Sequence, residues 1–152
     1  MSNAADWLIA KWMRNGYPVI IRMATAYRGM GTLPGYGHKI VVVIELRDPQ
    51  PSGMPPGSEY DDLEKAEFAI CGQLEAGNDS LCVLAITGCG TRDLIFYTRN
   101  AAEAEQRIEA ARSLVTSHKF EAAIQPDRDW ELYGYFDELV GKQKLQETKK
   151  PA

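Results

Sequence analysis

A chain of 152 residues has the length of one domain, and its 45 % hydrophobic and 25 % charged residues are typical of a globular protein. The formal net charge of −4 argues against general nucleic-acid binding, which usually requires a basic face. Three cysteines, Cys71, Cys82 and Cys89, are too few for a disulfide scaffold. Each lies in or beside an apolar stretch, so we expect three buried free thiols and a cytoplasmic location. We also expect no signal peptide and no membrane association, because no apolar run has the required length or flanks.

The N-terminal part is predicted to contain a helix, a strand and a loop. Residues 4–15 carry apolar side chains near helical spacing, and Asn15-Gly16 is typical of a helix end. Residues 17–25 form a β-rich run that begins with a proline, as a strand tolerates. Residues 28–37 are rich in glycine and are predicted to be a loop.

The next segment predicts a buried strand, a loop and a helix. Residues 40–46 are apolar without alternation, which predicts a central strand buried on both faces. Residues 48–57 contain four prolines and two glycines and cannot form regular structure. Ser58 and Asp61 match a capping box at the start of a helix that ends at Gly77-Asn78.

The C-terminal half predicts a hairpin, a helix, a strand and a short aromatic helix. We place these at 81–87 and 93–98 around a glycine turn at 88–90, and then at 100–115, 120–124 and 130–140. Asn100 is the expected cap of the longer helix, and Asp129 that of the aromatic one. Residues 1–140 are therefore expected to form one domain, and the polar, lysine-rich residues 141–152 a disordered tail.

From residue 40 onward the element order is strand, helix, strand, strand, helix, strand. This order is that of the split βαβ, or ferredoxin-like, α+β fold. Its two crossovers place both helices on one face of an antiparallel sheet. The predicted fold adds an N-terminal helix and strand and the C-terminal aromatic helix.

Four short motifs occur in a recognisable order between Trp7 and Leu139. They are Gly16-Tyr17-Pro18, Gly53-Met54-Pro55, Phe96-Tyr97-Thr98-Arg99 and Asp129-Trp130-Glu131-Leu132-Tyr133. In these motifs the chain resembles the bacterial family known as domain of unknown function 695. The resemblance implies no particular reaction. Some relatives are joined to a domain similar to the regulator of ribonuclease activity B, a ferredoxin-like protein inhibitor, and this pairing favours a regulatory role.

Cofactor and metal sites find little support in the residue pattern. Gly29-Met30-Gly31 begins a dinucleotide-binding motif, but Pro34 stands in the place of its third glycine. The chain has two histidines and no closely spaced pair of cysteines, which argues against a zinc site. We therefore expect no cofactor and no metal.

Cys89 is the one candidate nucleophile. It lies between two glycines, where a thiol can be exposed, and Arg92 nearby could lower its pKa. Its base would have to be His38 or His118, and the sequence positions neither of them beside it. We favour the other interpretation, in which the glycines form the hairpin turn and Cys89 is incidental.

A binding surface is the stronger prediction. Arg22, Arg92 and Arg99 lie on or beside strands and could surround an anion or flank a solvated sheet face. Trp130 and Tyr133 share one side of the aromatic helix and either anchor it to the sheet, which we favour, or line a binding groove.

The sequence thus favours a non-enzymatic binding or regulatory module that contacts a protein or small ligand through its sheet face or its long loops. The alternative is a small enzyme that uses Cys89 or a carboxylate, with a pocket between the 28–37 loop and the 88–90 turn. The absence of a positioned nucleophile and base favours the binding module.

Overall fold

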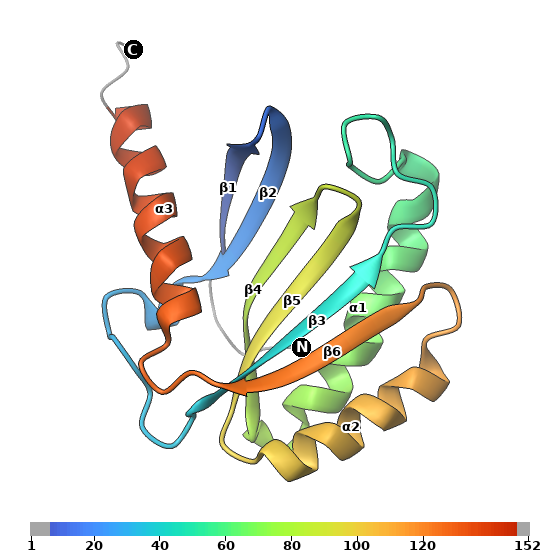
Figure 1. Ribbon diagram of the computed structural model, residues 1–152, viewed down its shortest axis with the longest axis vertical. Coiled ribbons are helices and arrows are strands. Elements are labelled where there is room, and N and C mark those ends of the chain that lie inside the picture. The colour runs from blue at the N-terminus through green and yellow to red at the C-terminus, as the bar shows by residue number, and fades with distance from the viewer. Residues whose placement is uncertain (1–6, 149–152) are drawn as a thin grey trace.

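A six-stranded antiparallel sheet and three α-helices make up the computed structural model, which describes residues 7–148, with side chains through residue 142 (Figure 1). The strands are β1 (Trp7–Arg14), β2 (Tyr17–Ala24), β3 (His38–Glu45), β4 (Ser80–Gly88), β5 (Thr91–Thr98) and β6 (Phe120–Pro126). The helices are α1 (Tyr60–Glu75), α2 (Ala101–Leu114) and α3 (Glu131–Thr148). The strands lie in the order β1-β2-β4-β5-β3-β6, with every neighbouring pair antiparallel.

The N-terminal segment is a strand, and the predicted helix is wrong. Asn15 and Gly16 both have positive φ, 51° and 85°, and join β1 to β2 as a two-residue hairpin turn. Asn-Gly is the preferred pair in this turn because both residues tolerate that conformation. Trp7 and Trp12 lie on opposite faces of the sheet, as side chains five apart in a strand must.

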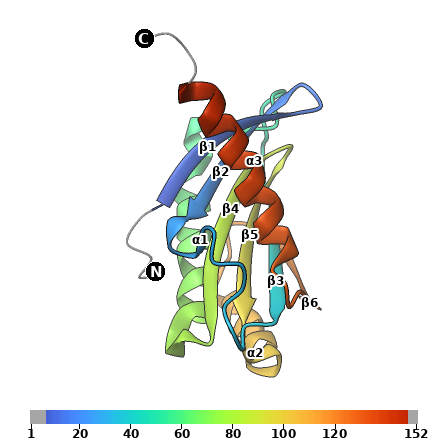
Figure 2. The same cartoon turned by 90° about the vertical axis from the view of Figure 1, so that its left-hand side faces the viewer.

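The helices divide between the two faces of the sheet (Figures 1 and 2). Helices α1 and α2 share one face, as expected, and bury Ile40, Val42 and Ile44 of β3 beneath them. Helix α3 lies on the other face, over a core from β2, β4 and β5. The sheet is therefore the middle layer between two separate apolar cores.

Strand β3 is buried mainly on one face, which corrects the expectation for its apolar run. Ile40, Val42 and Ile44 face α1 and α2 and are fully buried, whereas Val41 and Val43 are only half-buried. The core under α3 lies mainly over β2, β4 and β5, while β3 lies between β5 and β6. Strands β4 and β5 are the most deeply buried instead.

Of the three predicted helix N-caps, one is confirmed and two are wrong. Asn100 caps α2 by accepting a hydrogen bond from the backbone N–H of Glu103 at 3.1 Å, as predicted. Ser58 does not cap α1, because residues 57–59 form a 3₁₀ turn and Glu59 occupies the cap position.

Asp127, rather than Asp129, satisfies the start of α3. Its carboxylate accepts the backbone N–H groups of Glu131 and Leu132 at 2.8 and 3.2 Å. Trp130 has a left-handed backbone, φ 54°, so the chain turns there before the helix begins. The turn brings the N–H groups back over Asp127.

Helix α3 continues past residue 140 to Thr148. The tail expected at 141–152 therefore falls partly on helical residues, and its last four residues lie outside the described part of the chain. Among the described helices, none combines the length and apolar character needed to cross a membrane.

Candidate functional site: a groove between α1 and the β1–β2 hairpin

The β1–β2 hairpin leaves apolar side chains uncovered on the face that carries α1. Alternate residues of β1 point to this face, beginning with Trp7, which packs against the core beneath the helices. Further along the strand, Ile9 and Met13 are 69 % and 55 % exposed. The helices on this face pack over the other strands.

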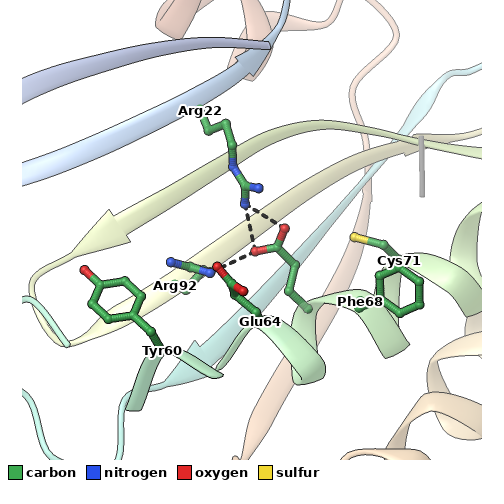
Figure 3. A pocket seen from close by; sticks show the side chains of 7 residues that line it. Arg22, Tyr60, Glu64, Phe68, Cys71 and Arg92 are labelled. Atoms are coloured by element: carbon green, nitrogen blue, oxygen red, sulfur yellow. Dashed lines mark hydrogen bonds and ion pairs between the residues drawn. The ribbon is translucent and has the colours of Figure 1, made fainter. Parts of the chain in front are cut away.

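A cavity of about 390 Å³ lies where the hairpin meets α1, and we call it the groove. Its floor is formed by Arg22 of β2 and Arg92 of β5. Its other lining residues belong to α1 and are Tyr60, Glu64, Glu67, Phe68 and Cys71. Figure 3 shows these side chains, with Tyr60 at one end of the groove and Phe68 and Cys71 at the other.

Glu67 joins the two arginines at the centre of the groove. Arg22 Nη2 donates to both of its carboxylate oxygens, at 2.7 and 2.6 Å, and Arg92 Nη1 donates to Oε1 at 3.0 Å (Figure 3). Arg92 also donates from Nε to Thr87 Oγ1 at 2.8 Å, and the Arg22 guanidinium lies 5.6 Å above the ring of Trp7. These bonds hold both guanidinium groups in place.

The groove is electrically balanced and has an apolar rim. Glu64 adds a second carboxylate, so the two arginines face two acids. Phe68 is 61 % exposed at the rim, and Tyr60 is also exposed. A ligand with an apolar surface and little net charge fits such a groove better than a free anion does.

The four predicted binding residues separate into two pairs. Arg22 and Arg92 meet at Glu67 in the groove. Trp130 and Tyr133 lie across the sheet in the core under α3, each only 2 % exposed. The predicted surface is therefore not continuous.

Trp130 and Tyr133 form an aromatic cluster with Tyr27 and Tyr97. The Trp130 ring stacks on Tyr97 at 4.0 Å between centroids and meets the other two tyrosines edge-on. The polar ends are satisfied: Trp130 Nε1 donates to the Tyr36 carbonyl at 2.8 Å, and the Tyr133 hydroxyl to that of Ala24 at 2.7 Å. Burial, and the hydrogen bond to Asp127, raise the pKa of Tyr97. These rings anchor α3.

Cys89 is exposed, which corrects the expectation that all three thiols are buried. It has φ 54° in the two-residue turn between β4 and β5. Loop 48–57 lies against this turn, where the N–H of Gly90 donates to the Gly53 carbonyl at 2.9 Å.

The pocket predicted between loop 28–37 and the 88–90 turn does not form. That loop leads into His38, which pairs with Thr98 at the end of β5 farthest from the turn. His118 has both ring nitrogens engaged, by Ser117 Oγ at 2.9 Å and Glu59 Oε2 at 2.7 Å. Among the described contacts, neither histidine meets Cys89.

The other two thiols are buried near α1. A hydrogen bond with Cys71, and burial, raise the pKa of Cys82. A protonated, buried thiol is a poor nucleophile.

Glu59 forms a buried hydrogen-bonded cluster that the sequence did not indicate. Its carboxylate accepts the backbone N–H groups of Arg47 and Asp48 at 2.8 and 3.2 Å and contacts His118. Burial opposes ionisation, but the hydrogen bonds outweigh it, and the net effect is to lower the pKa of Glu59. The cluster joins the start of α1 to the β3 and α2 ends.

Glu67 and Phe68 were also missed by sequence reasoning. Glu67 resembles any acid on a solvated helix face until the fold brings two arginines to it. Phe68 did carry a signal, because it falls outside the apolar face that includes Leu63, Ile70 and Leu74. A large aromatic residue on the polar side of a helix indicates a contact surface.

Comparison with known proteins gives one match. The model of a family of unknown function, DUF695, matches residues 5–139. No curated protein and no solved structure matches the chain.

Proposed function

This chain belongs to the DUF695 family of unknown function, and we propose that it is a non-catalytic binding module whose groove receives an apolar segment of a partner protein. The observation that carries the proposal is the exposed apolar rim. Phe68, Ile9 and Met13 are each more than half exposed on the same face as the groove. Exposed apolar side chains grouped in this way are typical of protein interaction sites.

The charges of the groove support a partner that carries few acids. Arg22 and Arg92 already share Glu67, so an incoming carboxylate would have to displace an internal ion pair. Glu64 is engaged in no hydrogen bond or ion pair among the described residues, and it would accept a lysine or arginine from the partner. We therefore propose an apolar segment flanked by a basic residue.

A cysteine- or carboxylate-dependent enzyme is the weaker alternative. Cys89 is exposed but lies at a turn without either histidine, and Cys71 and Cys82 are buried. Glu67, the central acid of the groove, is already bonded to two arginines. These placements favour binding.

The test compares two exposed residues. Phe68→Ser and Leu114→Ser each remove an exposed apolar side chain, but Leu114 is on α2 and does not line the groove. Proteins captured by the wild-type chain are purified, and their Kd for each variant is measured by calorimetry. We expect Phe68→Ser to weaken binding at least tenfold, with little change in the free energy of unfolding, and Leu114→Ser to leave the Kd unchanged. Equal Kd values for wild type and Phe68→Ser would contradict the proposal.

A second variant tests the charge argument. Glu64→Lys should weaken a partner that places a basic residue at the rim, whereas the same change at Glu105 on α2 should have no effect. Tighter binding by Glu64→Lys would show that the partner is acidic.

We also propose a ferredoxin-like core and a cytoplasmic location for this protein. The order β4-β5-β3-β6, with α1 and α2 as crossovers on one face, supports a ferredoxin-like core within residues 1–140 taken as one domain. The buried free thiols of Cys71 and Cys82 support a reducing, cytoplasmic location.

A further inference from the structure

A second cavity, of about 470 Å³, lies at the end of the sheet where β3 begins. It is formed by the 28–37 loop, the residue after β5, and the segment after β6. Its lining residues are Thr32, Leu33, Pro34, Gly35, Gly37, His38, Arg99, Pro126 and Arg128. Every charged or titratable side chain in this set is basic, although the whole chain has a net charge of −4.

Arg99 is held in place while part of its guanidinium stays available. Nε donates to Asp79 Oδ1 at 2.6 Å, and the guanidinium lies 5.5 Å above the ring of Tyr36. No described residue bonds its two terminal nitrogens, and the side chain is half-exposed. The guanidinium group of Arg99 is thus already oriented in the absence of a ligand.

Arg128 supplies a second cation with no internal partner. Among the described residues it takes part in no hydrogen bond and no ion pair. Its side chain lies against Gly37, where a Cβ would come within 3.5 Å of Arg128 Cγ. Arg99 and Arg128 therefore reach the cavity from separate segments.

Among the described acids, Asp79 offsets the charge of Arg99 through its ion pair at Nε, and none pairs with Arg128. Asp79 is bonded by Arg99, and Asp127 accepts the Tyr97 hydroxyl at 2.7 Å as well as two backbone N–H groups of α3. Asp129 follows Arg128 in the chain but does not line the cavity.

The loop that completes the cavity is held firmly. The N–H of Tyr36 donates to the Leu33 carbonyl at 3.1 Å across a tight turn in which Gly35 has φ 88°. The Tyr36 hydroxyl donates to the Asn78 carbonyl at 2.7 Å, and its own carbonyl accepts from Trp130. Little ordering is needed on binding, which favours affinity.

From this arrangement we propose that the cavity binds a phosphate monoester, with Arg99 and Arg128 donating to the phosphate and His38 beside them. Guanidinium groups match the oxygen geometry of phosphate and bind it in a charge-assisted way. Leu33, Pro34 and Pro126 offer an apolar wall to the remainder of the molecule. The volume is in the range of small-ligand sites. This site is separate from the groove and does not depend on the function proposed for it.

The test is a titration of the full chain with inorganic phosphate, phenyl phosphate and benzoate at constant ionic strength, followed by calorimetry and amide NMR shifts. We expect saturable binding of both phosphates, tighter for phenyl phosphate, with shifts at residues 32–38. Arg128→Ala should weaken binding about tenfold or more, the usual loss for one charge-assisted hydrogen bond. Because Arg128 has no internal partner, its variant should keep the wild-type melting temperature.

The matched control is Arg47→Ala, which removes an exposed arginine bonded to Asp62 outside this cavity. It should bind phenyl phosphate like the wild type. Absence of saturation, an equal loss in Arg47→Ala, or benzoate binding as tight as phenyl phosphate would overturn the proposal.

Discussion

The two faces of the sheet are covered in different ways. On the α3 face, stacked aromatic rings fill the space, and the indole and hydroxyl groups of Trp130 and Tyr133 each bond a backbone carbonyl. On the α1 face, the helices leave the β1–β2 hairpin uncovered, and Phe68 projects into solvent beside it. The rings under α3 are buried with their polar groups hydrogen-bonded, and we call this the closed face. The α1 face instead exposes apolar side chains that a partner can contact.

Two of the four recognisable sequence motifs meet in the core under α3. Tyr97, from the Phe96–Arg99 motif, stacks on Trp130, from the last motif, and its hydroxyl bonds Asp127. Residues of the groove, such as Glu67 and Phe68, lie in no such motif. Tyr97 and Trp130 therefore maintain the fold, and the motifs that contain them do not mark the proposed groove.

The largest expected effect comes from removing a buried ring from the core under α3. Trp130→Ala should lower the free energy of unfolding by about 3–5 kcal/mol, the usual cost of emptying a large buried aromatic site. The variant loses the stacking on Tyr97 and the hydrogen bond to Tyr36. Urea unfolding measures the change. Tyr135→Ala, which removes an exposed ring from the same helix, should change stability by less than about 0.5 kcal/mol.

An unchanged melting temperature for Trp130→Ala would refute the assignment of this ring to the core. If the same variant also lost its partner, the α3 face would become the binding surface in place of the groove.

The second prediction concerns the buried hydrogen-bonded cluster around Glu59 at the start of α1. The pKa of Glu59 lies below its ordinary value of 4.5, so its ionised form stabilises the fold. That contribution is present above about pH 4.5 and is lost as the pH falls through the lower pKa of the folded state. Glu59→Gln should therefore cost roughly 1–3 kcal/mol at neutral pH and show a smaller loss of stability in acid than the wild type.

Urea unfolding at neutral and acid pH provides the measurement. Other carboxylates also titrate, so the difference between variant and wild type is the relevant quantity. Glu121→Gln, an exposed change on β6, should follow the wild type at every pH. Parallel pH curves for Glu59→Gln and wild type would contradict the role of the cluster.

The smallest expected effect comes from exchanging residues between two hairpin turns, that of β1–β2 and that of β4–β5. Asn15-Gly16 and Cys89-Gly90 both place two residues at positive φ, but only asparagine tolerates that conformation well. Cys89→Asn should therefore stabilise the protein by up to about 1 kcal/mol in thermal unfolding. The reverse change, Asn15→Cys, should destabilise it. Loss of partner binding by a folded Cys89→Asn variant would instead point to a function of the thiol.

Local sequence was sufficient where an element depends on its own residues. Asn100 with Glu103 predicted the cap of α2, and the glycines around Cys89 predicted a hairpin. The helix predicted at residues 4–15 was wrong for two reasons. The tryptophans are spaced nearly as in a helix, and Asn15-Gly16 is typical both of a helix end and of a hairpin turn. Pairing with β2 decides between them, and that contact is made in the folded chain.

By itself, then, the sequence determined the α+β class, the family and most elements after residue 38, because periodicity and turn chemistry are local properties. Only the tertiary structure decided that Arg22 and Arg92 meet at Glu67, residues that are 45 and 25 positions from it along the chain. Likewise, it placed Trp130 and Tyr133 in the core and brought Arg99 and Arg128 to the lining of one cavity. Such contacts depend on strand order and on which face each helix covers, and no spacing along the chain encodes either.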